Sequence, residues 1–150
     1  MSLISGNIGG VDFKHMLRGY FYKLSYINMQ SGMKKPLIVN PIMVFSAIDS
    51  NSRIHGLDIR VLRNPYVFLE DYEKFYCVDG TIRNMQPEHP HAFSFRILKA
   101  LFLRNPDIEA AWRIYNPLYM KNIQDINIED TIRELKYNKN KVHTKEIGVI

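Results

Sequence analysis

The hydrophobic period of the chain changes at Asn64-Pro65. Before this dipeptide, apolar residues alternate with polar ones or form short runs between turn residues, which is typical of strands. After it, apolar residues recur at every third or fourth position, which is typical of helices. Asparagine is favoured just before a helix and proline at its first position, so the dipeptide also predicts a helix start. Together these features predict an α+β fold, a sheet followed by helices.

Three segments before the change predict strands. Residues 19–29 alternate, with tyrosine or leucine at every even position from 20 to 26. Residues 37–48 are almost wholly apolar and are interrupted at Asn40-Pro41, where we expect an edge or a bulge because proline cannot donate to a ladder. Residues 54–62 alternate again. Short polar turns join the three segments, so they predict an antiparallel meander, most simply closed as a small barrel.

The second part of the chain predicts four helices. The first begins at Pro65 and ends near Asp79-Gly80, because glycine suits the left-handed conformation that ends a helix. A proline-rich loop follows. The remaining helices are expected over residues 93–103, 106–115 and 127–136.

Length and composition favour one folded domain with two extensions. A chain of 150 residues fits a single domain, and its 46% hydrophobic content is too high for a disordered chain. We expect a domain over residues 17–137, with the barrel in 17–63 and the helices in 64–137. Residues 1–16 and 138–150 lack a sustained period and are expected to be arms that order on a partner. No run of about 18 apolar residues and no secretory leader is present, so we expect no membrane contact.

The net charge of +5 is unevenly distributed. Residues 1–63 carry eight basic and three acidic residues, whereas residues 64–137 carry nine basic and eleven acidic ones. A basic first half can bind nucleic acid or an acidic protein neighbour. Seven basic residues are the candidate contacts with such a partner: Arg18, Lys23, Lys34, Lys35, Arg53, Arg60 and Arg63.

The spacing of the candidate ligands does not fit a metal site or a bound cofactor. His89-Pro90-His91 lacks the third ligand and the usual spacing of a zinc site. Residues 49–52 begin like a calcium loop, but Arg53 stands where an oxygen ligand belongs, so a hairpin turn is the better interpretation. The glycine cluster at residues 6–10 lacks the lysine and hydroxyl residue of a phosphate-binding loop. We therefore expect no metal, no cofactor and no small-molecule substrate.

The sequence also offers no clear catalytic group. Cys77 is the only cysteine, and a position near a helix C-terminus raises a thiol pKa rather than lowering it. No serine stands in a nucleophile elbow. The acids of the first helix fall on its polar face. We predict a protein that is not an enzyme.

Three segments resemble a pattern found in small proteins of tailed bacteriophages. They are Arg18-Gly19-Tyr20-Phe21-Tyr22-Lys23-Leu24-Ser25-Tyr26, Lys35-Pro36-Leu37-Ile38-Val39 and Ile54-His55-Gly56-Leu57-Asp58-Ile59-Arg60-Val61-Leu62. The resemblance covers residues 18–65, and it implies an antiparallel Src-homology-3-like barrel at about residues 18–63, followed by helices. Members of that family carry labels such as virion component and DNA-end binding protein. The shared pattern is structural, so no catalytic residue is implied.

The resemblance and the arms together predict a structural component of a tailed-phage virion. We expect an adaptor in the baseplate, neck or portal region that contacts other virion proteins in a symmetric assembly, and that is present in the host cytoplasm during assembly. The alternative is a basic protein that binds DNA ends or single-stranded nucleic acid through the seven basic residues. The two differ in the salt dependence of nucleic-acid binding, which is steep only for the alternative.

Overall fold

The computed structural model describes residues 10–28, 37–78, 81–82 and 95–137. The strands are β1 (Phe21–Asn28), β2 (Leu37–Val39), β3 (Ile42–Ile48), β4 (Ile54–Asp58), β5 (Cys77–Val78), β6 (Thr81–Ile82), β7 (Trp112–Tyr115) and β8 (Met120–Ile126). The helices are α1 (Pro65–Tyr76), α2 (Phe95–Leu101), α3 (Ile108–Ala111) and a last helix over residues 128–137. Three short 3-10 turns are η2 (Phe13–His15), η3 (Ile59–Val61) and η4 (Pro117–Tyr119).

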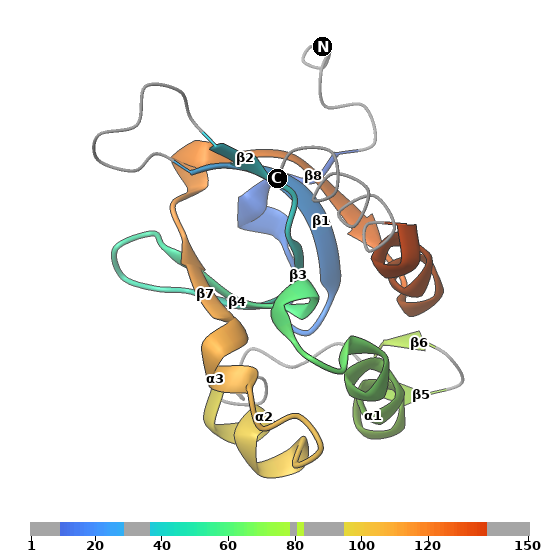
Figure 1. Cartoon of the computed structure of the whole chain (residues 1–150). Coiled ribbons are helices and arrows are strands. Elements are labelled where there is room, and N and C mark those ends of the chain that lie inside the picture. Colours follow the sequence, from blue (N-terminus) through green and yellow to red (C-terminus); the bar gives the residue numbers. More distant parts are fainter. Residues whose placement is uncertain (1–9, 29–36, 79–80, 83–94, 138–150) are drawn as a thin grey trace.

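The large sheet is a curled antiparallel half-barrel, so the α+β class is confirmed. β1 pairs with β8 on one side and with β2 and β3 on the other, and β4 and β7 follow. β2 and β3 share one register along β1, because Tyr26 lies opposite Val39 and Lys23 lies opposite Ile42. The six strands therefore occupy five positions. Figure 1 looks along the curl and shows β8, β1, β3, β4 and β7 around an open ring.

The predicted interruption at Asn40-Pro41 is confirmed, and it separates β2 from β3. The Leu24 amide donates to the Pro41 carbonyl at 3.2 Å. Proline has no amide hydrogen to donate to the Leu24 carbonyl, so the pairing of β1 with this segment lacks one hydrogen bond at Pro41. The register continues unchanged on both sides, which means that the break is not a bulge.

The third predicted strand, residues 54–62, ends earlier than expected. β4 stops at Asp58, and η3 turns the chain away from the sheet. The Asp58 side chain causes this turn, because its Oδ1 accepts the Arg60 amide at 3.1 Å and so caps η3. Its two carboxylate oxygens also bind the Arg60 guanidinium at 3.0 and 3.2 Å.

The sheet does not end at residue 63, so the barrel predicted over residues 18–63 is incomplete by itself. The helix predicted over residues 106–115 is wrong in extent, since only α3 forms within it. β7 follows α3 and pairs with β4. β8, which the periodicity did not predict, returns to pair with β1. In the sequence 112–115 two aromatics flank arginine and isoleucine, and such residues favour a strand once a neighbouring strand is available.

The predicted helix starts at Pro65 and after Asn127 are confirmed. α3, however, begins at Ile108 instead of Pro106, and the start predicted at residue 93 lies outside the described residues. α1 begins at Pro65 as expected, but the Asn64 side chain makes no capping bond to it. α1 ends at Tyr76, before the predicted end at Asp79-Gly80, which lies outside the described residues. The last helix begins after Asn127, whose Oδ1 accepts the Asp130 amide at 2.7 Å.

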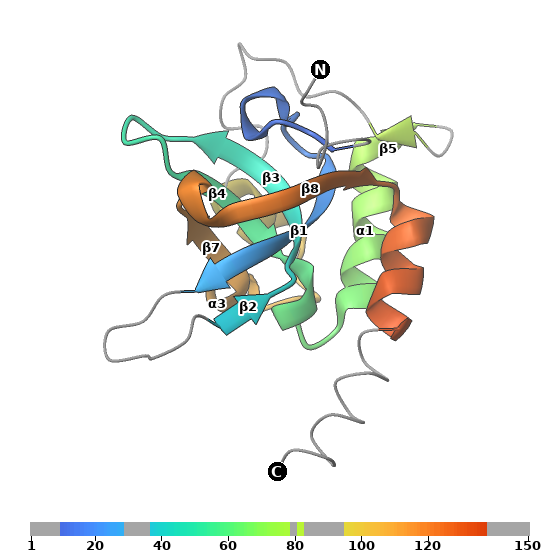
Figure 2. The same cartoon turned by 90° about the horizontal axis from the view of Figure 1, so that it is seen from above.

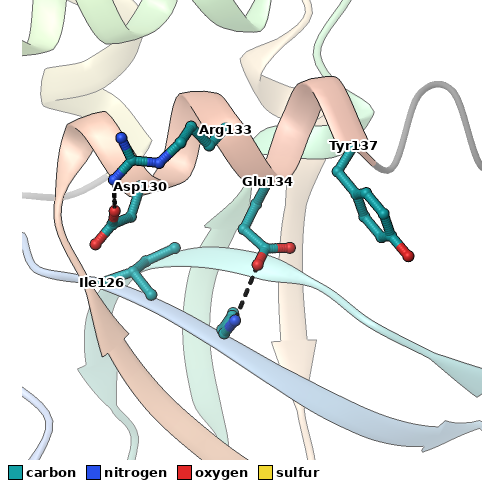
Figure 3. Close-up of a pocket in the computed structure, with 6 residues that line it drawn as sticks. Ile126, Asp130, Arg133, Glu134 and Tyr137 are labelled. Carbon is teal, nitrogen blue, oxygen red and sulfur yellow. Dashed lines mark hydrogen bonds and ion pairs between the residues drawn. The ribbon is translucent and has the colours of Figure 1, made fainter.

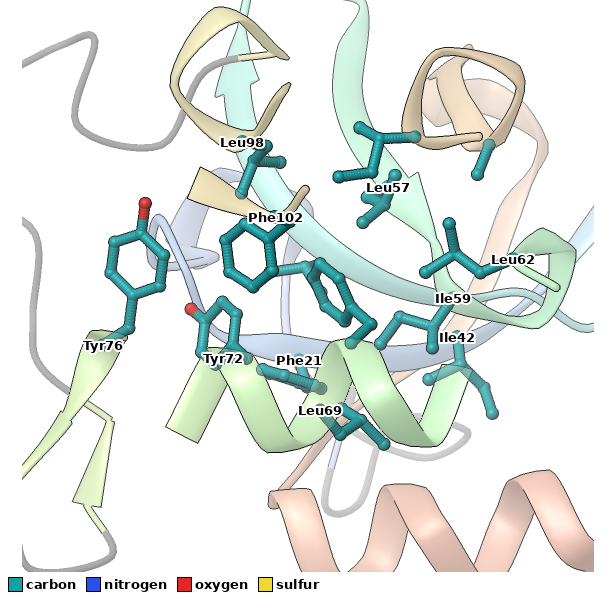
Figure 4. Packing of buried hydrophobic residues seen from close by; sticks show 14 of the residues in the cluster. Phe21, Ile42, Leu57, Ile59, Leu62, Leu69, Tyr72, Tyr76, Leu98 and Phe102 are labelled. Atoms are coloured by element: carbon teal, nitrogen blue, oxygen red, sulfur yellow. The ribbon is translucent and has the colours of Figure 1, made fainter. Parts of the chain in front are cut away.

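The convex face of the sheet packs against the helices. This outer core includes Phe21 from β1 and Phe68, Tyr72 and Phe102 from the helical region. The rings of Phe21 and Tyr72 meet edge to face at 4.9 Å, and those of Phe68 and Phe102 stack at 4.8 Å. Figure 4 shows Phe21, Tyr72 and Phe102 meeting between the sheet and the helices. The burial of these aromatic side chains stabilises the packing of the helices on the sheet.

The concave face holds a second, inner core. The predicted alternation of β1 is confirmed, because Tyr22 and Leu24 point inward, with Tyr20 and Tyr26 packed against the same cluster. Residues 10–16, assigned above to an arm, lie across one end of the curl. Met16 is buried there, and the Val11 amide donates to the Ile123 carbonyl at 2.8 Å. Residues 1–9 and 138–150, the rest of the two arms, lie outside the described residues.

Candidate functional site

The structure places five of the seven candidate basic residues. Lys34 and Lys35 lie outside the described residues. Lys23 is taken up by an ion pair with Glu134 of the last helix at 2.9 Å, and Arg60 by the pair with Asp58 at 3.0 Å. The Arg18 guanidinium donates to the Ser46 carbonyl at 3.0 Å. These three side chains therefore hold parts of the fold together.

The other two candidates are exposed and lie apart. Arg53 precedes β4 and Arg63 follows η3, so β4 separates them. The Arg53 guanidinium donates to the Asn51 carbonyl at 3.3 Å within its turn. The Arg63 amide donates to Asp107 at 2.9 Å, and the residue is exposed. Arg53 and Arg63 do not form one continuous basic row along a strand or helix.

A small pocket of about 340 Å³ lies where β1 meets the last helix. Lys23, Asp130, Arg133 and Glu134 line it, together with Ile126 and Tyr137. Lys23 forms an ion pair with Glu134, and Figure 3 shows Arg133 facing Asp130. Each cation already has a carboxylate partner: Lys23–Glu134 joins the sheet to the helix, and Arg133–Asp130 lies within the helix.

A larger depression of about 710 Å³ separates residues 10–15 from β8. Here β8 contains a bulge, because Lys23 lies opposite Gln124 whereas Ser25 lies opposite Lys121. Asn122 takes the extra place with φ 54°, a left-handed conformation that asparagine tolerates better than most residues. The Ile123 carbonyl next to it points outward and accepts the Val11 amide. The bulge thus provides the attachment point of the N-terminal segment.

The motifs tested for chemistry have structural roles where they are described. Asp49 Oδ1 accepts the amides of Asn51 and Arg53 at 2.8 and 3.0 Å, which confirms the hairpin turn. His55 Nε2 lies 2.8 Å from Asp49 Oδ2, and this contact is the main cause of the lowered pKa of Asp49. Burial raises the pKa of the Cys77 thiol, which favours its unreactive form. His89 and His91 lie outside the described residues.

Across residues 10–28, 37–78, 81–82 and 95–137, no three His, Cys, Asp or Glu side chains are grouped to hold a metal ion. In the same part of the chain no helix is long and apolar enough to cross a membrane.

Arg104 joins the α2–α3 connection to α1 and carries a prediction about pH. Its guanidinium binds Asp71 at 3.1 Å and Glu70 at 2.8 Å. The bond from Arg104 lowers the pKa of Asp71 below its ordinary 3.8. A carboxyl group whose pKa is lowered in the folded state stabilises the fold at pH values above its ordinary pKa. This stability is lost as the pH falls through the lowered pKa. We expect Asp71→Asn to lower the midpoint of urea unfolding at pH 7, with a difference from wild type that narrows from about pH 5 to pH 2.

Glu73→Gln is the matched control, since Glu73 is an exposed acid of the same helix. It should leave the pH dependence of the midpoint as in wild type. A constant difference between Asp71→Asn and wild type over this range would contradict the assignment.

Exposed apolar side chains lie in η4 and in the strand before it. The η4 surface consists of Ile114, Leu118 and Tyr119, with exposed fractions of 60%, 77% and 37%. Sequence reasoning did not single out these residues. The only local indication was Asn116-Pro117, a further copy of the dipeptide that begins α1.

The η4 turn is held in place from both sides. Asn116 Oδ1 accepts the Leu118 amide at 3.1 Å, and the Asn116 amide donates to the Tyr26 hydroxyl at 3.0 Å. The Tyr26 ring meets those of Tyr115 and Tyr119 edge to face at 5.1 and 6.3 Å. Tyr115 and Met120, which flank the turn, are buried. Leu118 is therefore exposed on a fixed backbone.

No protein-family model matches the chain, and neither a curated protein nor a solved structure matches it significantly.

Proposed function

We propose that this protein is a structural, non-enzymatic component of a tailed-phage particle, placed in the baseplate, neck or portal region. It acts by binding neighbouring virion proteins and is present in the host cytoplasm during assembly. The resemblance over residues 18–65 supports the phage origin. The η4 surface supports the mode of action.

The observation that carries the proposal is the exposure of Leu118 on a fixed turn. An apolar side chain in water gains free energy when a partner covers it, by about 1.5–3 kcal/mol for a leucine. The gain is largest where the backbone is already ordered, because binding then costs little conformational entropy. Leu118 meets both conditions, since it is 77% exposed, its amide is bonded to Asn116, and Asn116 is bonded in turn to Tyr26.

We further propose that the half-barrel is of the Src-homology-3-like type implied by the resemblance. The return of the last strand, β8, to the first strand, β1, supports this assignment. The 3-10 turn η4 spans the gap between the edge strands β7 and β8. The helices between β4 and β7 are then an insertion in the barrel.

Leu118→Asp tests the proposal. A charge at an apolar anchor should cost about 2 kcal/mol or more of binding energy, so we expect roughly 30-fold less of the variant in purified particles. Gln124→Asp introduces the same charge at an exposed position of β8 and is the control. Incorporation is measured by quantitative mass spectrometry, and thermal unfolding verifies that both variants fold. Wild-type incorporation of Leu118→Asp would refute the proposed surface.

The alternative, a nucleic-acid binder, keeps one supporting observation. Arg53 and Arg63 are exposed, and neither takes part in the ion pairs among the described residues. A fall of log affinity with log salt, removed by the double variant Arg53→Ser/Arg63→Ser, would support this alternative. Undetectable binding to duplex and single-stranded DNA at low salt would remove it.

A further inference from the structure

β2 is a strand with one side unpaired. It pairs with β1, and no other described strand pairs with it. Its exposed residues Leu37 and Ile38 are 48% and 61% accessible. Figure 2 shows β2 at the edge of the sheet, at the end opposite η2. Unpaired strand edges and exposed apolar side chains favour pairing with another strand.

The hydrogen bonds of the sheet fix which main-chain groups face outward. In an antiparallel ladder, alternate residues bond to the same neighbouring strand. The Leu24 amide bonds to the Pro41 carbonyl, and the Phe45 amide bonds to the Tyr20 carbonyl. Leu37 and Val39 are an even number of residues away from Pro41, so their main-chain amides and carbonyls face β1. The amide and carbonyl of Ile38 therefore point away from the sheet.

The early end of β4 is the reason that this edge is bare. β4 pairs with β3 as far as Asp58, which lies opposite Met43. A longer β4 would have continued along β2. The turn capped by Asp58 diverts the chain into η3 and α1 instead.

We propose that β2 pairs antiparallel with β2 of a second copy of this chain, about a two-fold axis at Ile38. An antiparallel pair of identical strands is symmetric, so each Ile38 amide meets the Ile38 carbonyl of the other copy. Leu37 then faces Val39 of the second copy. Every facing pair is apolar and uncharged, so no like charges oppose the contact. The inference does not depend on the proposed function.

The contact is short, so the dimer is weak. Stable interfaces bury about 1,200–2,000 Å², more than three residue pairs provide. We therefore test association at up to about 1 mM protein by sedimentation equilibrium. Wild-type protein should show a dimer whose fraction rises with concentration. Monomeric wild-type protein at 1 mM would overturn the proposal.

Two variants at Ile38 separate this edge from other contacts. Ile38→Pro removes the outward amide and leaves the bonds of residues 37 and 39 to β1, and proline is tolerated on such an edge. Ile38→Lys places two like charges opposite each other. Both variants should be monomeric at every concentration, while Leu103→Ser, at a 79% exposed leucine outside the sheet, should dimerise as wild type does. Dimerisation of Ile38→Lys, or its loss in Leu103→Ser, would contradict the proposal.

A cross-link provides the second measurement. In a Cys77→Ala background, Ile38→Cys should form a disulfide-linked dimer on mild oxidation, because directly bonded antiparallel residues have Cα atoms about 5.5 Å apart. Leu103→Cys in the same background is the control for random collision. Equal cross-linking of the two variants would overturn the proposal.

Discussion

A chain that ends at residue 63 should not fold. It keeps β1 to β4 but lacks β7 and β8, which pair with the two sides of that sheet. The inner core then loses Tyr115, Met120 and Ile123, and the outer core loses all of its helical residues. We expect a far-ultraviolet circular dichroism spectrum without regular structure and no cooperative thermal transition.

A chain of residues 10–137 is the control for this truncation. It retains both cores and every strand of the half-barrel, so it should unfold cooperatively near the wild-type midpoint. A cooperative transition in the chain of residues 1–63 would show that the first half folds by itself. The structural role assigned to β7 and β8 would then be wrong.

Phe21→Ala should cost about 3–5 kcal/mol of unfolding free energy. Phe21 is fully buried and contacts the Tyr72 ring of α1 edge to face at 4.9 Å. Its removal leaves a cavity between β1 and the helices, and close packing on both sides prevents the cavity from collapsing. Urea unfolding monitored by fluorescence gives the free energy.

Tyr22→Phe is the matched control, because it changes the adjacent residue of the same strand without leaving a cavity. It removes the hydroxyl that accepts the Leu17 amide at 2.7 Å, and such a bond contributes about 0.5–1.5 kcal/mol. Equal losses in the two variants would contradict the cavity that we expect at Phe21.

The first half of the fold could be predicted because its pattern is local. The alternation of β1 has period two, and the structure places its tyrosines on the concave side. The break at Pro41 follows from the missing amide of proline. The end of β4 could not be predicted this way, because the apolar residues 59, 61 and 62 continue a strand pattern. The capping bond of Asp58 prevails over that pattern.

β8 was missed because a bulge hides its period. Its inward residues Met120 and Ile123 are three apart, a spacing that suits a helix better than a strand. The extra residue is Asn122, whose left-handed φ cannot be inferred from the sequence alone. β7 was missed because the acids and proline at its N-terminal side favour a helix, which forms only over Ile108–Ala111.

The sequence identifies the basic residues that could contact a partner, but it does not show which of them are already paired within the fold. Lys23 and Glu134 are 111 positions apart, so no spacing rule reveals that they form a pair. The exposure of Leu118 could not be predicted either, because an apolar residue close to a tyrosine and a methionine suggests a buried position. Only the fold shows that Tyr115 and Met120, which flank the turn, are buried and that Leu118 is exposed.

The composition of purified phage particles tests the central claim most directly. Particles from infected cells are separated on a density gradient and analysed by quantitative mass spectrometry. We predict that this chain co-sediments with the particles at a constant molar ratio to the major capsid protein across the peak. Particles that lack the chain, with all of it in the soluble fraction of the lysate, would contradict the claim.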